Sequence, residues 1–288
     1  MRSQKVILIT GCSSGFGFES TIALARAGHA VFAGVRNIRS DGAIKLYRRA
    51  KQEKLPIILV TIDVDSNKSV ASGISRVIKK ASRIDVLINN AGFGTRGPVE
   101  DFSIEEVKEQ FNTNVYGTLR MIKAVTPIMR KHRSGLIINF SSISGLVSFP
   151  LFSIYSASKF AIETLTEGLW FELSHFGIHV CMLEPGSFKT GFSKNRKDAR
   201  SMYRKNSPYK KLLANFDRRY AVTHSKTVGI VSKQKGTEEV VRKIVEIVNS
   251  DAPKLRYRVG MDAHKNYWIR KLLPDWVWLR LLRKIYKW

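Results

Sequence analysis

The chain has 288 residues, of which 44% are hydrophobic and 25% are charged, as in soluble globular proteins. Its 49 Lys and Arg against 23 Asp and Glu give a net charge of +26, which favours anionic partners such as nucleic acid, acidic lipid surfaces or phosphorylated ligands. The two cysteines have no disulfide-framework or metal-site spacing and no signal peptide is visible, so we expect a cytoplasmic protein without a metal.

The first predicted element is a short apolar strand at residues 5–10, followed by a glycine-rich turn and a helix at 19–27. Glycines let the backbone approach a pyrophosphate, and the helix N-terminus offers free N–H groups. Strand, glycine turn and helix together predict a dinucleotide-binding site. The turn residues assigned to that site are Thr10, Gly11, Ser13, Ser14, Gly15, Phe16 and Gly17.

The second strand, residues 30–35, ends at Val35 and is followed by Arg36. Folds that bind NAD carry an acidic residue here for the ribose 2′-hydroxyl, and this chain has none. The guanidinium of Arg36 can bind a 2′-phosphate by a charged, fork-shaped contact. The alternative interpretation is that Arg36 is a solvated surface charge in a basic protein. We therefore predict NADP(H) in preference to NAD(H).

The third strand, residues 57–62, is followed by Asp63 and Val64. Asp63 either binds the adenine amino group or, with Ser66, caps the next helix. The other predicted elements are helices at 43–54, 69–81, 104–132 and 155–176, and strands at 86–88, 136–140, 179–183 and 255–259. Pro127 bends the long helix or marks an internal break.

This alternation of strands and helices predicts an α/β fold with a doubly wound parallel sheet, in which ligands lie beyond the carboxyl ends of the strands. We expect one catalytic domain over residues 1–265, with a basic, mobile insertion over the active site at 187–235 and a basic amphipathic tail at 266–288.

Tyr155 and Lys159 are four positions apart and share a face of the predicted helix. A phenol titrates near pH 10, and a fixed ammonium beside it lowers its pKa toward the working range. Ser142 supplies a hydroxyl that can hold a carbonyl or alcohol oxygen. The alternative is an ordinary helix with a buried tyrosine and an exposed lysine.

Taken together, the motifs resemble those of the short-chain dehydrogenase/reductase family over about residues 5–192, and more loosely over 237–260. They are Thr10-Gly11-x-x-x-Gly15-x-Gly17, Asn89-Asn90-Ala91-Gly92, Asn114, Ser142, Tyr155-x-x-x-Lys159, and Pro185-Gly186 with Thr190. The resemblance implies a Rossmann-type sheet of about seven strands with helices on both faces, a nicotinamide cofactor, and hydride transfer to or from a carbonyl or alcohol.

The resemblance also assigns roles. Tyr155 is the general acid/base, Lys159 lowers its pKa and binds the nicotinamide ribose, Ser142 orients the substrate oxygen, and Asn114 holds a water that relays protons. Further cofactor-binding positions carried over in this way are Val64, Asn90, Ala91, Gly92, Pro185, Gly186, Phe188 and Thr190.

Within the family the chain is similar to the 17β-hydroxysteroid and retinol dehydrogenase branch, which implies an apolar steroid-, retinoid- or lipid-like substrate and a homo-oligomer. The competing hypothesis is a protein that keeps the fold as a scaffold for binding membranes. Nucleic acid is not expected, because no nucleic-acid motif accompanies the charge.

The tail predicts a final helix that starts at Pro274 with Asp275 in its first turn. Its basic stripe comprises Arg280, Arg283, Lys284 and Lys287, and its wide apolar remainder comprises Trp278, Leu279, Leu281, Leu282, Ile285, Tyr286 and Trp288. This pattern is typical of a helix lying in an anionic membrane interface, with the protein peripheral on that surface. The alternative is that the helix packs on its own domain or on a partner subunit as part of the substrate pocket.

Overall fold

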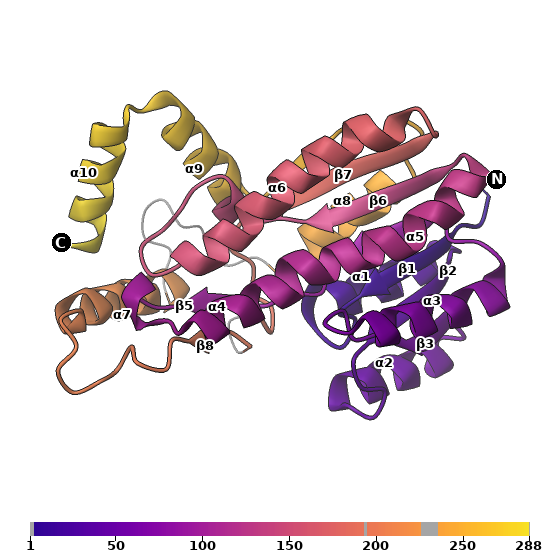
Figure 1. The fold of residues 1–288 in the computed structure, drawn as a ribbon, viewed down its shortest axis with the longest axis horizontal. Coiled ribbons are helices and arrows are strands. Elements are labelled where there is room, and N and C mark those ends of the chain that lie inside the picture. The colour runs from indigo at the N-terminus through magenta and orange to yellow at the C-terminus, as the bar shows by residue number, and fades with distance from the viewer. Residues whose placement is uncertain (1–2, 193–194, 226–235, 288) are drawn as a thin grey trace.

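A seven-stranded sheet forms the centre of the computed structural model, which describes residues 3–192, 195–225 and 236–287 (Figure 1). All its strand pairs are parallel, in the order β3-β2-β1-β4-β6-β7-β9. The strands are β1 (Val6–Thr10), β2 (Ala30–Val35), β3 (Ile57–Thr61), β4 (Val86–Asn89), β6 (Gly135–Phe140), β7 (Ile178–Pro185) and β9 (Arg256–Val259). The order reverses between β1 and β4, which confirms the predicted doubly wound sheet and opens a crevice at their carboxyl ends.

Helices cover both faces of the sheet, so its central strands, such as β1 and β4, are buried on both faces instead of alternating. In β1, Ile7 and Ile9 join the apolar cluster on one face and Leu8 joins the cluster on the other, all fully buried. The helices α1 (Gly15–Arg26), α2 (Asp41–Gln52) and α8 (Glu238–Val248) contribute to the first cluster, and α3 (Asn67–Ala81), α5 (Thr118–His132) and α6 (Ser153–Ser174) contribute to the second.

The long helix expected at residues 104–132 is interrupted, but Pro127 is not the cause. A π-helical turn at Asn112–Gly117 separates α4 (Ile104–Phe111) from α5, and Pro127 lies inside α5. A Cβ added to Gly117 would lie 2.8 Å from Cγ2 of Val64, so the chain is held close to the loop after β3. The interruption therefore coincides with the tertiary contact between Gly117 and Val64, and not with Pro127.

Described parts of the insertion expected at 187–235 contact the rest of the domain, and its mobility stays a prediction. The strand β8 (Lys197–Asp198) pairs in parallel with β5 (Thr95–Arg96), and the helix α7 (Lys210–Ser225) follows. Buried Arg96 is ion-paired with Asp198 at 2.6 Å and with Asp217 at 2.5 Å. Residues 193–194 and 226–235 of the insertion lie outside the described residues.

Two helices follow β9. The first, α9 (Met261–Leu272), contains the boundary that we expected at residue 266, and the second, α10 (Asp275–Tyr286), begins directly after Pro274 as predicted. Trp278 and Leu282 of α10 are buried in a cluster with Ile143 and Val147, which follow β6. Within the three described ranges, no helix has the length and apolarity to cross a membrane.

Candidate functional site

The glycine turn after β1 is held by side chains at the neighbouring strand ends. Thr10 Oγ1 accepts hydrogen bonds from the backbone N–H groups of Asn90, at 3.1 Å, and Ala91, at 3.0 Å. The Asn90 amide donates in return to the carbonyl oxygens of Thr10, at 2.9 Å, and Gly11, at 3.2 Å. The ends of β1 and β4 are thus locked together at the point where the strand order reverses.

Two glycines of the motif are required by close packing. A Cβ on Gly17 would lie 2.5 Å from the carbonyl oxygen of Gly11, and one on Gly11 would lie 2.9 Å from Cα of Ala91. Gly11 also has a φ of +72°, which side-chain-bearing residues rarely adopt. Helix α1 therefore starts at Gly15, earlier than the expected residue 19, and its free N–H groups lie next to the turn.

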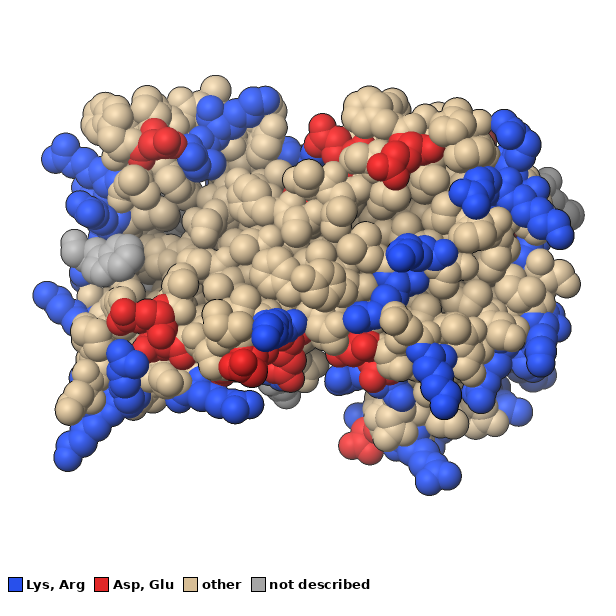
Figure 2. All heavy atoms as spheres, in the orientation of Figure 1, with Lys and Arg blue, Asp and Glu red and all other residues tan. Residues whose placement is uncertain are grey.

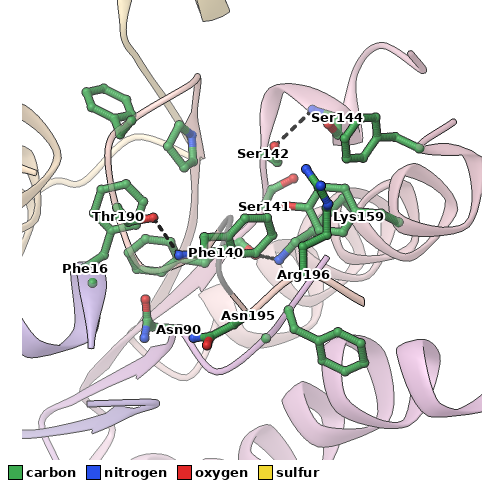
Figure 3. Close-up of a pocket in the computed structure, with 18 of the residues that line it drawn as sticks. Phe16, Asn90, Phe140, Ser141, Ser142, Ser144, Lys159, Thr190, Asn195 and Arg196 are labelled. Carbon is green, nitrogen blue, oxygen red and sulfur yellow. Dashed lines mark hydrogen bonds between the residues drawn. The ribbon is translucent and has the colours of Figure 1, made fainter. Parts of the chain in front are cut away.

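A cavity of about 780 Å³ opens beyond the carboxyl ends of the strands (Figure 3). Most of the predicted site residues line it: Gly11, Ser13, Ser14, Gly15, Phe16, Arg36, Val64, Asn90, Ala91, Gly92, Ser142, Tyr155, Lys159, Pro185, Gly186, Phe188 and Thr190. Figure 3 shows Phe16, Asn90 and Thr190 on one side, with Ser141, Ser142 and Lys159 facing them. The cavity therefore joins the glycine turn to the residues expected to carry the chemistry.

Asp63 is not among the residues that line the cavity, and the adenine role that we considered for it stays a prediction. Its carboxylate accepts a hydrogen bond from the backbone N–H of Asp65 at 3.1 Å, and Ser66 alone caps α3. Asp65 lines the cavity instead and accepts from the Thr113 hydroxyl at 2.9 Å.

Ser142, Tyr155 and Lys159 meet in the cavity although they come from different elements. Ser142 follows β6, while Tyr155 and Lys159 lie in the first turns of α6. The Lys159 ammonium is 5.9 Å from the centre of the Tyr155 ring and donates to the carbonyl oxygen of Phe140 at 2.8 Å. This oxygen fixes the lysine beside the tyrosine, so Lys159 is buried and the alternative of an exposed lysine is excluded.

Burial changes the proton affinities of both groups. Burial raises the pKa of Tyr155 to about 12, although a hydrogen bond with Ser142 lowers it. This net rise is opposite to the lowering of the pKa that we expected from the neighbouring Lys159. Burial likewise lowers the pKa of Lys159 to about 8, while the nearby Glu163 carboxylate raises it. Burial therefore weakens the hold of Lys159 on its proton, and Glu163 strengthens it.

Asn114 lies beside the cavity but does not line it. Its side chain accepts from the backbone N–H of Phe93 at 3.1 Å and donates to Phe93 O at 3.0 Å and to Ser158 Oγ at 3.1 Å. Its backbone carbonyl accepts from Thr118 Oγ1 at 2.9 Å. In this arrangement Asn114 braces the loop after β4 against α6. The role of water holder that we expected for it stays a prediction.

Side chains that sequence reasoning left unassigned line the rest of the cavity; many are aromatic or aliphatic, and others are polar, among them Asn195, Arg196 and Lys197. The Phe192 ring lies 5.5 Å from that of Tyr155, centre to centre. From α10, the cavity is lined by Trp278, Leu281, Leu282, Ile285 and Tyr286. The tail helix thus packs on its own domain, which is the alternative that we considered. The apolar periodicity of the tail is the sequence feature that indicated this contact.

The cavity offers what a nicotinamide dinucleotide requires: a backbone cradle that a Cβ would fill, a helix N-terminus, and Arg36 at the end of β2. At its other end, it places a hydroxyl, a phenol and an ammonium against apolar walls. Such a set can move a proton to or from an oxygen atom next to a carbon that gains or loses a hydride.

Comparison with known proteins agrees with this geometry. The family model described as short chain dehydrogenase matches residues 5–201. The chain is 35% identical to a 3-ketodihydrosphingosine reductase from Bacteroides thetaiotaomicron, over 98% of both chains. It is 34% identical to retinol dehydrogenase 8 from Homo sapiens, over 90% of this chain and 82% of that one.

Solved structures share the fold. A short-chain dehydrogenase from Streptomyces avermitilis superimposes with a TM-score of 0.80 at 30% identity, over 97% of this chain and 96% of that one. A variant of ElxO solved with NADPH bound gives a TM-score of 0.70 at 25% identity, over 89% and 96%. The chain belongs to the short-chain dehydrogenase family of oxidoreductases, with a likeness to its steroid and retinol dehydrogenase branch.

Proposed function

We propose that the protein is an NADP(H)-dependent oxidoreductase that interconverts a ketone and an alcohol on a large apolar substrate. The observation that carries this proposal is that Ser142, Tyr155 and Lys159 line the same cavity as the glycine turn and the apolar wall of α10. When bound, the nicotinamide supplies or accepts the hydride.

The chain's own residues handle the oxygen and its proton. Ser142 donates a hydrogen bond that orients the substrate oxygen, and Tyr155 gives its proton to that oxygen in reduction or takes it back in oxidation. Lys159, held by Phe140 O, stabilises the phenolate that remains. The apolar wall excludes water from these groups, which strengthens each interaction.

Arg36 supports NADP(H) over NAD(H). It is exposed at the end of β2, lines the cavity, and has no ion-pair partner among the described residues, so its guanidinium is available to a 2′-phosphate. The ElxO relative, which binds NADPH, adds support from comparison. Val35 leaves no carboxylate at the position that would favour NAD.

The walls support a long-chain or polycyclic substrate. Phe149, Phe152 and Phe192 line the cavity together with the α10 residues, and these groups favour hydrocarbon over a sugar or an organic acid. The relative named as a 3-ketodihydrosphingosine reductase supports a ketone on a long aliphatic chain. A homo-oligomer remains our expectation and is tested by light scattering.

The test uses purified full-length protein with NADPH and 3-ketodihydrosphingosine, and with NADP⁺ and estradiol or retinol, following absorbance of the reduced nicotinamide. We expect turnover of at least one of these by the parent and none by Tyr155→Phe. A protein that binds NADPH but turns over no ketone or alcohol of this class would instead support the scaffold hypothesis.

A further inference from the structure

The helix α10 has apolar side chains on two opposite sides. Trp278 and Leu282 face inward and are 6% and 8% exposed, whereas Trp276 and Leu279 are 68% and 57% exposed. A helix that only packs on a core needs one apolar stripe. Trp276 and Leu279, the outer pair, are not buried in the core and do not line the substrate cavity.

The outer pair lies on a second surface pocket, whose lining residues all belong to α10 and which shares Leu282 with the substrate cavity. Its lining combines Trp276 and Leu279 with Arg280 and Arg283, and also includes Leu282. We call Trp276, Leu279, Arg280 and Arg283 the outer face of α10. Nearby in the chain, Trp268 and Leu272 of α9 are 49% and 73% exposed. Large exposed apolar groups thus gather at this end of the molecule.

The charge of this region is almost purely positive. Between residues 261 and 287 there are seven Lys and Arg and only two acids, Asp262 and Asp275. Asp262 is buried and accepts from the backbone N–H of Ser187, and Asp275 is ion-paired with Arg270 at 2.6 Å. Arg280, Arg283 and Lys284 have no ion-pair partner in the part of the chain that the structure describes. Figure 2 shows Lys and Arg side chains projecting at this end.

We propose that the outer face of α10 docks on the surface of an anionic lipid bilayer, with its apolar pair at the acyl boundary and its arginines on the head groups. Exposed Trp and Leu beside Arg are the combination that lies in a membrane interface. A second copy of this chain fits less well, because a symmetric contact would bring the two sets of arginines together in a protein of charge +26.

This surface gives the substrate a short route, which rests on the proposed function. The same helix presents Trp278, Leu281 and Ile285 to the substrate cavity and Trp276 and Leu279 to the bilayer. An apolar substrate dissolved in lipid would then reach the cavity past α10 without crossing water. The docking of α10 does not require that the protein act on a lipid, so the two proposals are tested separately.

The experiment is sedimentation of the full-length protein with sucrose-loaded vesicles of phosphatidylcholine alone or with phosphatidylserine, at low and high salt. We expect binding to the anionic vesicles that weakens with salt. The paired variant Trp276→Ser/Leu279→Ser should lose binding, and Arg280→Gln/Arg283→Gln should lower the partition coefficient roughly thirtyfold, since each basic residue near the surface contributes about fivefold.

Phe171→Ser is the matched control, because Phe171 on α6 is also 66% exposed but lies away from α10. It should bind vesicles like the parent. None of the altered residues lines the substrate cavity, so NADPH binding and thermal unfolding should be unchanged in every variant. Absence of parent binding to anionic vesicles at low salt, or equal binding by the Trp276/Leu279 variant, would overturn the proposal. So would light scattering in which that variant dissociates a parent dimer, because the occupant would then be a second copy.

Discussion

The carboxylate of Glu163 on α6 is ion-paired with the guanidinium of Arg256 on β9, one helical turn beyond Lys159. Buried Glu184 on β7 shares the same guanidinium at 3.5 Å and is also paired with Arg258 at 3.0 Å. Burial, together with the charge of Glu184, raises the pKa of Glu163 to about 7. The row Tyr155, Lys159, Glu163 is thus connected to the edge of the sheet.

Glu163→Gln should change the pH dependence of ketone reduction. The Glu163 carboxylate raises the pKa of Lys159, which burial lowers to about 8, so its loss lets that pKa fall further. The alkaline limb of kcat/KM should therefore move to lower pH by roughly one unit. The measurement is a pH profile with NADPH as the cofactor.

Glu167→Gln is the control for that profile. Glu167 pairs with the same Arg256 at 2.6 Å but is 53% exposed at its side chain. Its removal should leave the alkaline limb where it is in the parent. Identical limbs for Glu163→Gln and the parent would show that Glu163 does not act on Lys159.

Arg256→Met should destabilise the fold by roughly 3 kcal/mol, because it leaves buried carboxylates without their main partner. The loss should be larger at pH 8 than at pH 5. The reason is that Arg256 lowers the pKa of Glu163, which burial and Glu184 raise from 4.5 to about 7. Without Arg256 the folded protein holds that proton to higher pH, so stability falls further than in the parent as pH rises. Urea unfolding at the two pH values measures this; a loss independent of pH would contradict it.

Tyr155→Phe keeps the ring in its buried position and removes the proton that it exchanges. Turnover should fall by about 10²–10⁴-fold while NADPH affinity stays close to that of the parent. Single-turnover kinetics and calorimetry measure the two quantities. Parent-like turnover on a good substrate would refute the role of Tyr155.

Replacing Val35 with Asp and Arg36 with Leu should shift cofactor preference from NADPH toward NADH. The new carboxylate can accept from a ribose 2′-hydroxyl, and the cation that suits a 2′-phosphate is gone. Calorimetric titration of both cofactors into both proteins measures the change. Tighter binding of NADH than of NADPH by the parent would show that Arg36 does not select the cofactor.

Gly42→Ala should weaken NADPH binding by roughly tenfold or more, since small displacements of binding groups are costly. A Cβ at Gly42, in the first turn of α2, would lie 1.9 Å from the carbonyl oxygen of Ser13, so α2 and the glycine turn would have to separate. The control is Gly168→Ala in α6, where the nearest atom to the new Cβ is 4.0 Å away. Equal affinity in the two variants would rule out this coupling.

The sequence reveals the features of this molecule that depend on neighbours along the chain. The apolar run of β1 with its glycine turn and the helical spacing of Tyr155 and Lys159 are local patterns, and they predicted the sheet and most of the cavity residues. Asp65 was missed because only the path of the chain after β3 decides which acid faces the cavity.

Contacts between distant segments were beyond such patterns. Arg96 meets Asp198 and Asp217, which are 102 and 121 positions away, and no periodicity records that pairing. The π-helical turn at Asn112–Gly117 was likewise not predicted, and it lies where Gly117 approaches Val64, a contact between distant segments. The amphipathic pattern of α10 was likewise insufficient, because it predicted equally a helix in a membrane interface and a helix that lines the substrate cavity.

The π-helical turn at Asn112–Gly117 also constrains the number of residues between α4 and α5. It accommodates extra backbone within a helical path, so removing one residue there would restore regular α-helical hydrogen bonding and lengthen the helix. The same deletion would shift the turn that carries Asn114, whose side chain is hydrogen-bonded to Phe93 and Ser158. A shorter turn would then be the more regular helix, but it would disturb the contacts by which Asn114 braces the loop after β4 against α6.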